Sequence, residues 1–195
     1  MQNIPAVLTA LRNATSELHR EVERLVPLLE KDFDQGKFVR WLRIMHPFYK
    51  GLDDQINQPD FLKLIGWNYI PRSTLIERDL SMLEAGLPSL DDFPPPLLKK
   101  LDTNYKRIGS LYVVEGSSLG GQILQKALSR SVPMVEQHGS AFLSPHKDAT
   151  KAHWVQFIEC LGSFGNEQHS SDEIIDGASM TFSAMSGWIR GQWHD

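Results

Sequence analysis

The sequence lacks the features that mark membrane, secreted or disulfide-rich proteins. It has one cysteine, Cys160, among 195 residues, which excludes an intramolecular disulfide framework. No apolar run approaches the roughly 20 residues of a membrane span. The amino-terminal stretch has no basic leader followed by an apolar block. We therefore expect a cytoplasmic protein with no membrane partner.

Excess positive charge and the common catalytic motifs are also missing. The net charge is -4, which argues against a dedicated nucleic-acid binder. The sequence contains no HxxxH, HExxH or CxxC spacing, so a zinc or di-iron site is not expected. It has no GxSxG elbow, and Cys160 lies in an apolar context, so the sequence does not indicate a catalytic nucleophile. The 41% of hydrophobic residues is typical of a globular protein, and we expect one domain over residues 1–195.

Hydrophobic residues recur at helical spacing along most of the chain, and convincing strand patterns are absent. We therefore predict an all-α fold. Within it, Pro47 is expected to kink its helix, Ser73 to cap one helix at its start and Gly86 to cap the same helix at its end. The predicted helices cover residues 7–30, 35–56, 72–86, 97–130, 150–161 and 171–190, and a proline triplet at 94–96 lies in a surface connection.

The most informative segment is the glycine-rich middle of the fourth predicted helix, IGSLYVVEGSSLGGQ over residues 108–122. A phosphate-binding loop is disfavoured, because no Lys-Ser/Thr pair follows the glycines and no β–α alternation surrounds them. In a helix, Gly116 and Gly120 share one face, with Ser117 and Gly121 beside them. Interior glycines cost about 0.5–1 kcal/mol each. Either close packing of another helix or close approach of a flat ligand could offset that cost.

His19 lies at the border of the apolar stripe of the first predicted helix. Glu23 is one turn later on the same face and can accept a proton from the imidazole Nδ1, which would aim Nε2 outward as in a metal ligand. Arg12 lies seven residues earlier, about 10.5 Å along a helix. An imidazole with a cation two turns away suits an anionic porphyrin. Of the other histidines, His46 is expected in the core, and the surface is expected to hold His138, His146, His153, His169 and His194.

The chain resembles the haem oxygenase family, in particular its bacterial, biliverdin-producing branch. Three segments carry the resemblance: residues 11–19 (LRNATSELH), 111–122 (LYVVEGSSLGGQ) and 178–182 (ASMTF). They are similar to the proximal helix, the glycine-rich distal helix and the final helix of that family. The resemblance implies a single-domain helical bundle with a kinked distal helix.

The resemblance also implies a reaction and a set of residue roles. Haem would be both cofactor and substrate, and it would be opened with O2 and external electrons to biliverdin, carbon monoxide and iron, favouring attack at the α meso carbon. His19 would ligate the iron and Glu23 would hydrogen-bond it. The distal side would be lined by Gly116, Ser117, Gly120, Gly121 and Tyr49. Arg12 would contact a haem propionate and Lys151 the second one, Tyr112 would lie at the haem edge, and Phe182 would form part of the pocket wall.

One residue departs from the family pattern. Many members carry an aspartate after the first distal glycine, whereas this chain has Ser117, so proton delivery would rely on water and backbone groups, with help from Tyr49. The implied partners are a ferredoxin or an NAD(P)H-dependent reductase, and a phytochrome that accepts the bilin product. Two other functions stay open: a non-catalytic haem sensor or carrier, and a helical module that uses its glycine face to bind a partner helix.

Overall fold

The protein is a bundle of α-helices. The computed structural model describes residues 5–26, 28, 30, 32–89, 100–130, 132–133, 135, 140–165 and 168–193, and these residues contain no strand. The prediction of an all-α fold is confirmed. The elements are α1 (Ala6–Leu25), α2 (Gln35–Ile56), α3 (Pro59–Ile65), α4 (Arg72–Met82), α5 (Asn104–Leu128), the short 3₁₀ turn η1 (Lys147–Ala149), α7 (Thr150–Phe164) and α8 (Gln168–Trp193).

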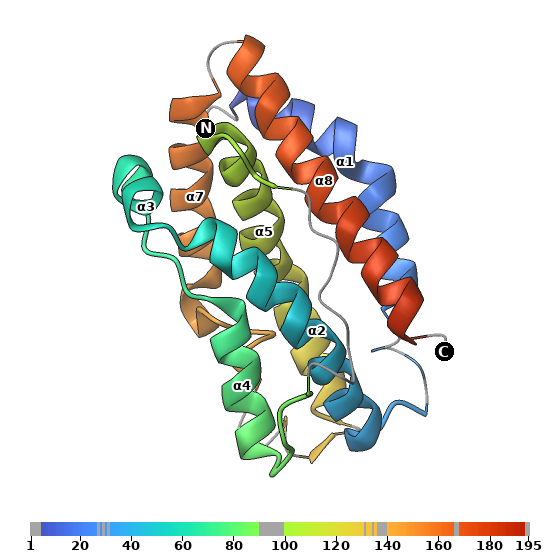
Figure 1. Cartoon of the computed structure of the whole chain (residues 1–195). Coiled ribbons are helices and arrows are strands. Elements are labelled where there is room, and N and C mark those ends of the chain that lie inside the picture. Colours follow the sequence, from blue (N-terminus) through green and yellow to red (C-terminus); the bar gives the residue numbers. More distant parts are fainter. Residues whose placement is uncertain are drawn as a thin grey trace.

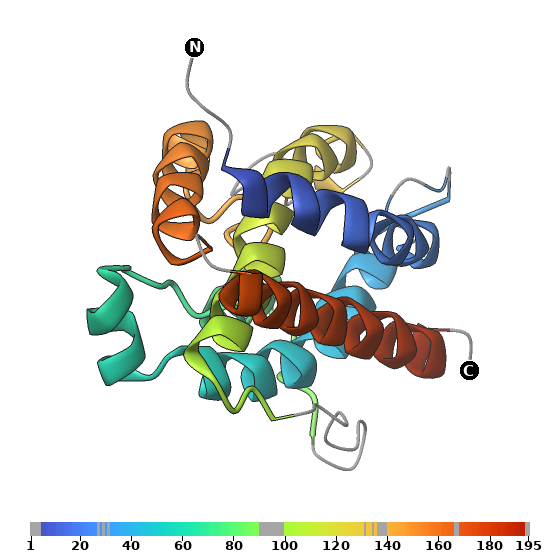
Figure 2. The ribbon, with the colours of Figure 1, turned by 90° about the horizontal axis from the view of Figure 1, so that it is seen from above.

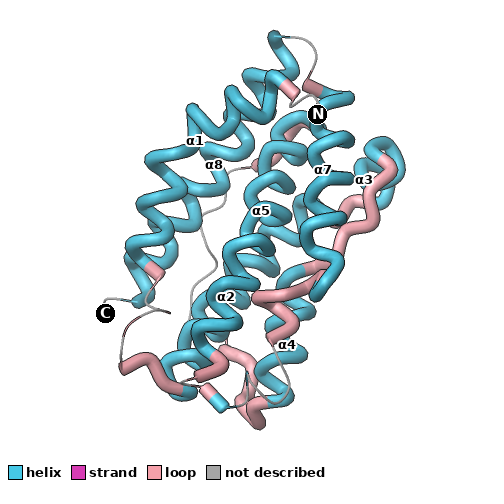
Figure 3. The backbone as a smooth tube through the Cα atoms, turned by 180° about the vertical axis from the view of Figure 1, so that it is seen from behind, coloured by secondary structure: helices cyan, strands magenta, loops and turns pink. Residues whose placement is uncertain are grey.

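The long helix α5 lies at the centre of the bundle (Figure 1). α8 packs against α5 and also against α1, and these two outer helices lie side by side in the front and back views (Figures 1 and 3). α7 packs against α5 on another side, and α4 packs against α2. Seen from above, α1 and α8 run across the bundle in roughly the same direction, next to each other (Figure 2). This arrangement leaves the middle of α5 facing the space between α1, α2 and α8.

Two glycines outside the predicted site allow α5 and α8 to cross closely. A Cβ on Gly109 would overlap the backbone carbonyl of Ile174, and a Cβ on Gly177 would overlap that of Lys106. Beside this crossing, the Thr181 hydroxyl donates a 2.8 Å hydrogen bond to Ser110. The α5–α8 contact therefore depends on small residues at one place, and it fixes the angle at which α8 passes the pocket.

The predicted boundaries of the second helix are confirmed. Asp34 caps α2 by accepting a 2.8 Å hydrogen bond from the Lys37 backbone N–H, and the helix runs through Pro47 to Ile56. His46 is buried in this helix, as expected, and its Nε2 lies 2.9 Å from Glu77 Oε1. α5 runs without interruption through all of its glycines.

Other boundaries differ from the prediction. α1 ends at Leu25 because Val26 is extended, and α4 ends at Met82, before Gly86. Ser73 does not cap α4; it lies inside the helix, and its backbone N–H donates to Asp53. The short α3 was not predicted, because seven residues give too few turns for a periodic pattern.

α5 begins at Asn104 rather than at residue 97 because Thr103 caps it through the Lys106 N–H. Pro27, the prolines at 94–96, His138 and His194 lie outside the described residues. Within the described residues, none of the helices combines the length and the apolar character that a membrane span requires.

Candidate haem site

A pocket of about 590 Å³ opens between α1, α2, α5 and α8, within the usual range for small-molecule sites. Its wall is mainly apolar, with a few polar side chains set into it. The residues that line it are Arg12, His19, Val22, Glu23, Val26, Leu28, Trp41, Met45, Tyr49, Tyr112, Val113, Gly116, Ser117, Leu119, Gly120, Gly121, Ile123, Leu124, Phe142, Leu143, Trp154, Phe182, Met185 and Ile189.

α1 brings the predicted iron ligand to this pocket. His19 is half exposed, and its ring meets the edge of Phe182 with ring centroids 5.6 Å apart. Its Nδ1 lies 3.6 Å from Glu23 Oε1, which is close but longer than a hydrogen bond. The pocket wall therefore presents one imidazole, with a carboxylate one turn behind it.

Arg12 lines the same pocket and is the sole lysine or arginine in its described wall. Its guanidinium lies beside the Tyr112 hydroxyl, and Thr15 is the other near neighbour of that phenol. Burial raises the pKa of Tyr112, and the positive charge of Arg12 lowers it in part. The pocket thus carries one fixed positive charge at the α1–α5 edge, where an anionic ligand group would be stabilised.

The three glycines of α5 that line the pocket differ in what surrounds them. Gly120 has open space where a side chain would begin. A Cβ on Gly116 would lie 3.5 Å from the Trp154 ring, an ordinary contact distance. A Cβ on Gly121 would overlap the backbone carbonyl of Leu143. Both predicted explanations for the glycines therefore apply, at different positions: Gly121 permits close packing, and Gly120 leaves the pocket open.

Two hydroxyl groups lie on the α2–α5 side of the pocket. Burial raises the pKa of Tyr49 to about 12, although the Arg72 charge and the neighbouring Ser117 hydroxyl act in the opposite direction. The Ser117 hydroxyl also donates a 2.7 Å hydrogen bond to the Val114 carbonyl. At neutral pH Tyr49 is therefore a neutral phenol that can donate a hydrogen bond.

The structure gathers ten of the eleven predicted site residues around this one pocket. The exception is Lys151, which is exposed at the start of α7 and is not part of the pocket wall. The wall residues that the sequence did not indicate include Phe142, Leu143 and Trp154. The only local signal for the first two was an apolar pair inside a segment expected to be irregular.

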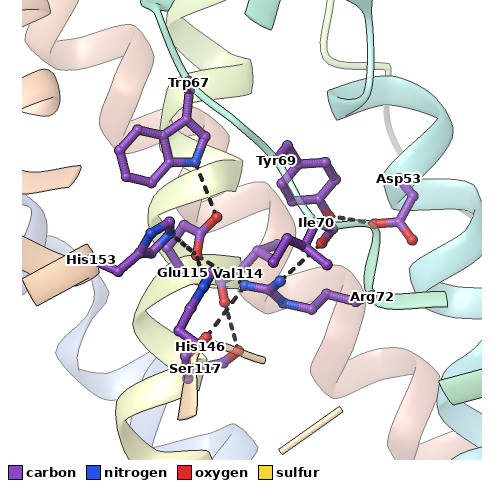
Figure 4. A network of polar contacts seen from close by, with 11 residues as sticks. Asp53, Trp67, Tyr69, Ile70, Arg72, Val114, Glu115, Ser117, His146 and His153 are labelled. Atoms are coloured by element: carbon purple, nitrogen blue, oxygen red, sulfur yellow. Dashed lines mark hydrogen bonds and ion pairs between the residues drawn. The ribbon is translucent and has the colours of Figure 1, made fainter. Parts of the chain in front are cut away.

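Two histidines expected on the surface are not there. The His146 and His153 side chains are only 8% and 20% exposed, and both lie against the buried carboxylate of Glu115 behind the pocket (Figure 4). The polar sequence around the two histidines does not indicate this burial, because their partner Glu115 is 31 residues from His146 and 38 residues from His153. The exposed position of His169 agrees with the prediction.

The residues of the pocket fit a haem. An imidazole is a common axial ligand of haem iron, a single cation suits a propionate, and the apolar wall suits a porphyrin ring. The open space at Gly120 leaves room for a flat ligand to approach the helix backbone, which a larger residue would restrict.

Comparisons with known proteins agree with this fit. The family model described as heme oxygenase matches residues 6–190. The heme oxygenase of Xanthomonas campestris pv. campestris (strain 8004) is 32% identical over 152 residues, which is 76% of this chain and 86% of that protein.

Solved structures share the fold. The NO- and CO-bound heme oxygenase from Neisseria meningitidis has a TM-score of 0.73 and 24% identity, over 96% of this chain and 92% of that one. Heme oxygenase from Leptospira interrogans has a TM-score of 0.77 and 19% identity, over 95% and 99% of the two chains. The family match, the curated relative and the fold lead to one conclusion. The chain belongs to the haem oxygenase family and is an oxidoreductase of that family.

Proposed function

We propose that the pocket binds haem with His19 as the iron ligand and that the enzyme opens the macrocycle to biliverdin, carbon monoxide and iron. The observation that carries this proposal is that His19, Arg12 and the open face of Gly120 line a single cavity. His19 contributes the sole imidazole to the described wall. When bound, haem supplies the iron at which O2 is activated; the protein binds and orients it and controls access of water.

On the α1 side, we assign binding and orientation. His19 Nε2 would hold the iron, while Glu23, 3.6 Å from Nδ1, would accept the Nδ1 proton after a small rotamer change. Arg12 would pair with a propionate, and Tyr112 beside it would present its hydroxyl to the same group. Phe182 packs against the His19 ring and limits its rotation. Lys151 remains a weaker candidate for a second propionate contact, because it lies outside the wall.

On the α5 side, we assign access and proton supply. Gly120 and Gly116 keep side chains away from the helix surface, so that the ring can lie against the backbone. The Tyr49 phenol holds its proton at neutral pH, and the Ser117 hydroxyl lies beside it. The Tyr49 phenol can donate a hydrogen bond to water in the pocket, and the Ser117 oxygen, whose own proton goes to the Val114 carbonyl, can accept one. Together they would replace the aspartate that holds this water in many relatives.

The electrons and the fate of the product require partners. We infer that a ferredoxin or an NAD(P)H-dependent reductase supplies electrons, and that a phytochrome is one acceptor of the bilin. Support comes from the reaction itself, because no residue of the pocket is a redox group. Assays with each donor, and with an apo-phytochrome added to the product mixture, test these two inferences.

The first experiment is a titration of the protein with hemin, followed by addition of ascorbate in air. His19→Ala is expected to lower hemin affinity by about tenfold or more and to change the Soret band. The matched control is His169→Ala, which removes an exposed histidine of α8 away from the pocket and should bind hemin as the wild type does.

Two outcomes would contradict the proposal. A His19-dependent Soret band that no electron donor bleaches would identify a sensor or carrier. Ser117→Asp would then test whether the aspartate found in many relatives allows turnover. Equal hemin binding by the wild type and His19→Ala would remove His19 from the iron. Identification of the biliverdin isomer then tests the expected attack at the α carbon.

A further inference from the structure

A buried polar cluster surrounds Glu115 of α5, which is not part of the pocket wall (Figure 4). Its centre is the Glu115 carboxylate, which is completely buried. Four donors surround it: Arg72 NH2 at 2.9 Å, His153 Nε2 at 3.2 Å and His146 Nε2 at 3.3 Å, all from Oε2, and Trp67 Nε1 at 3.1 Å from Oε1. Nothing in the assigned reaction uses these groups.

The cluster joins parts of the chain that would otherwise be independent. Trp67 follows α3, Arg72 begins α4, His146 precedes η1, and His153 lies on α7. Arg72 is 1% exposed and also donates to the Ile70 carbonyl and, at 3.3 Å, to Ser118. Glu115 therefore connects α5 with the segments that cover its buried side.

Three members of the cluster lie on stretches of chain that also supply the pocket wall. Glu115 directly precedes Gly116, and His153 directly precedes Trp154, whose ring would meet a Cβ on Gly116 at 3.5 Å. His146 lies three residues after Leu143, whose carbonyl lies against Gly121. The stretch with His146 and the stretch with His153 thus each present one side chain to Glu115 and another, from Leu143 or Trp154, to the pocket.

The charges and geometry favour a hydrogen-bonded cluster over a metal site. The Glu115 and histidine ligand atoms lie within 4.8 Å of one another, a spacing that a metal ion tolerates. However, the Arg72 guanidinium already neutralises the carboxylate at Oε2 and would repel a dication. The two imidazoles are stacked, with centroids 3.5 Å apart and planes at 23°. One Nε2–H donor from each ring satisfies this arrangement.

We propose that Glu115 is a positioning residue for the haem pocket. Through His146 and His153 it holds the Phe142–Leu143 wall and Trp154 against the glycine face of α5. The hydrogen bonds at Nε2 also require a proton on that nitrogen of both imidazoles, because a carboxylate oxygen can only accept. The proposal rests on the function assigned to the pocket, but the geometry it describes exists without haem.

The test compares two variants of the full chain. His153→Phe keeps a ring that can pack on Trp67, whose centroid is 4.6 Å away, but removes the donor to Glu115. His153→Gln keeps a donor. We expect His153→Phe to weaken hemin binding about tenfold and His153→Gln to stay within about twofold.

A haem-independent readout separates this proposal from the function it rests on. In apo protein, ¹⁵N spectra of the imidazoles should show a proton on Nε2 of both His146 and His153. His153→Phe should shift the backbone amide signals of Gly116 and Gly120 and leave those of Gly187 and Gly191 on α8 unchanged. If wild-type protein binds no hemin, the proposed function fails while these spectra still test the cluster.

Three results would overturn the positioning role: unchanged Gly116 and Gly120 signals in His153→Phe, Nδ1–H tautomers in the wild type, or equal hemin affinity in the two His153 variants. A titration with Zn²⁺ alone provides a further test. Stoichiometric binding that His153→Gln abolishes would make the cluster a metal site instead.

Discussion

The two faces of α5 show how one helical segment meets opposite demands. On the pocket face, Ser117, Gly120 and Ile123 are exposed to the cavity, and nothing lies within 4 Å of a Cβ on Gly120. On the other face, Glu115 and Ser118 are buried in the polar cluster, and at its border with the pocket Gly121 packs against the Leu143 carbonyl. The pocket face makes few contacts with the rest of the protein, which leaves room for a ligand. The contacts that hold α5 in place therefore have to come from the buried face.

The largest expected effect comes from breaking the buried face. Glu115→Gln removes the charge that compensates Arg72 and should cost about 3–5 kcal/mol of unfolding free energy at pH 7. Hydrogen bonds from the histidines and the Arg72 charge outweigh burial and hold the pKa of Glu115 well below its usual range.

The lowered pKa of Glu115 also predicts how the stability difference between wild type and Glu115→Gln changes with pH. A carboxyl with a lowered pKa stabilises the fold above its unfolded pKa of about 4.3, and the stabilisation is lost as the pH falls below that value. The difference between wild type and Glu115→Gln should therefore shrink in acid. Denaturant unfolding at a series of pH values measures it. Glu17→Gln, at an exposed site on α1, is the control and should match the wild type. A penalty that does not change with pH would contradict the charge argument.

Gly121→Ala should come next, with a loss of about 1–3 kcal/mol in unfolding free energy. The new Cβ would overlap the Leu143 carbonyl, and backbone cannot move aside as a side-chain tip can. The matched control is Gly187→Ala on α8, where a Cβ meets nothing within 4 Å. Thermal unfolding of both variants measures the difference. Equal stability would show that the backbone at Leu143 can move away from the new methyl group at no cost in stability.

The pocket face should respond in the opposite direction. Gly120→Ala places a methyl group in open space, so the apo protein should gain about 0.5–1 kcal/mol of stability. The same methyl group would stand between the helix backbone and the ligand, and hemin affinity should fall. Unfolding and hemin titrations on one preparation measure both. A variant that gains stability and binds hemin as tightly as before would show that the ring does not approach Gly120.

The buried face is also where prediction from sequence was weakest. Helical periodicity placed α2 at residues 35–56, and the resemblance indicated His19 and the glycines, because these signals are local. His146 and His153 were expected on the surface, because local polarity carries no information about a carboxylate 31 or 38 residues away. Likewise, the spacing of the glycines could not distinguish Gly120 from Gly121, because only the neighbouring loop decides which of them is packed.

The smallest effect concerns Tyr49, which lies in the pocket wall but is buried like the residues of the other face. Its pKa of about 12 means that the phenol stays neutral at every pH at which the enzyme is expected to work. Burial penalises the phenolate, so the folded protein loses stability as the pH rises from the unfolded pKa of about 10 toward 12, and it is unaffected below that range. Tyr49→Phe should therefore leave stability nearly unchanged at pH 7 and make alkaline unfolding less steep between these values. A phenolate signal from Tyr49 below pH 10, seen as the difference between the ultraviolet titrations of the two proteins, would contradict the raised pKa and show that the wall does not bury the phenol.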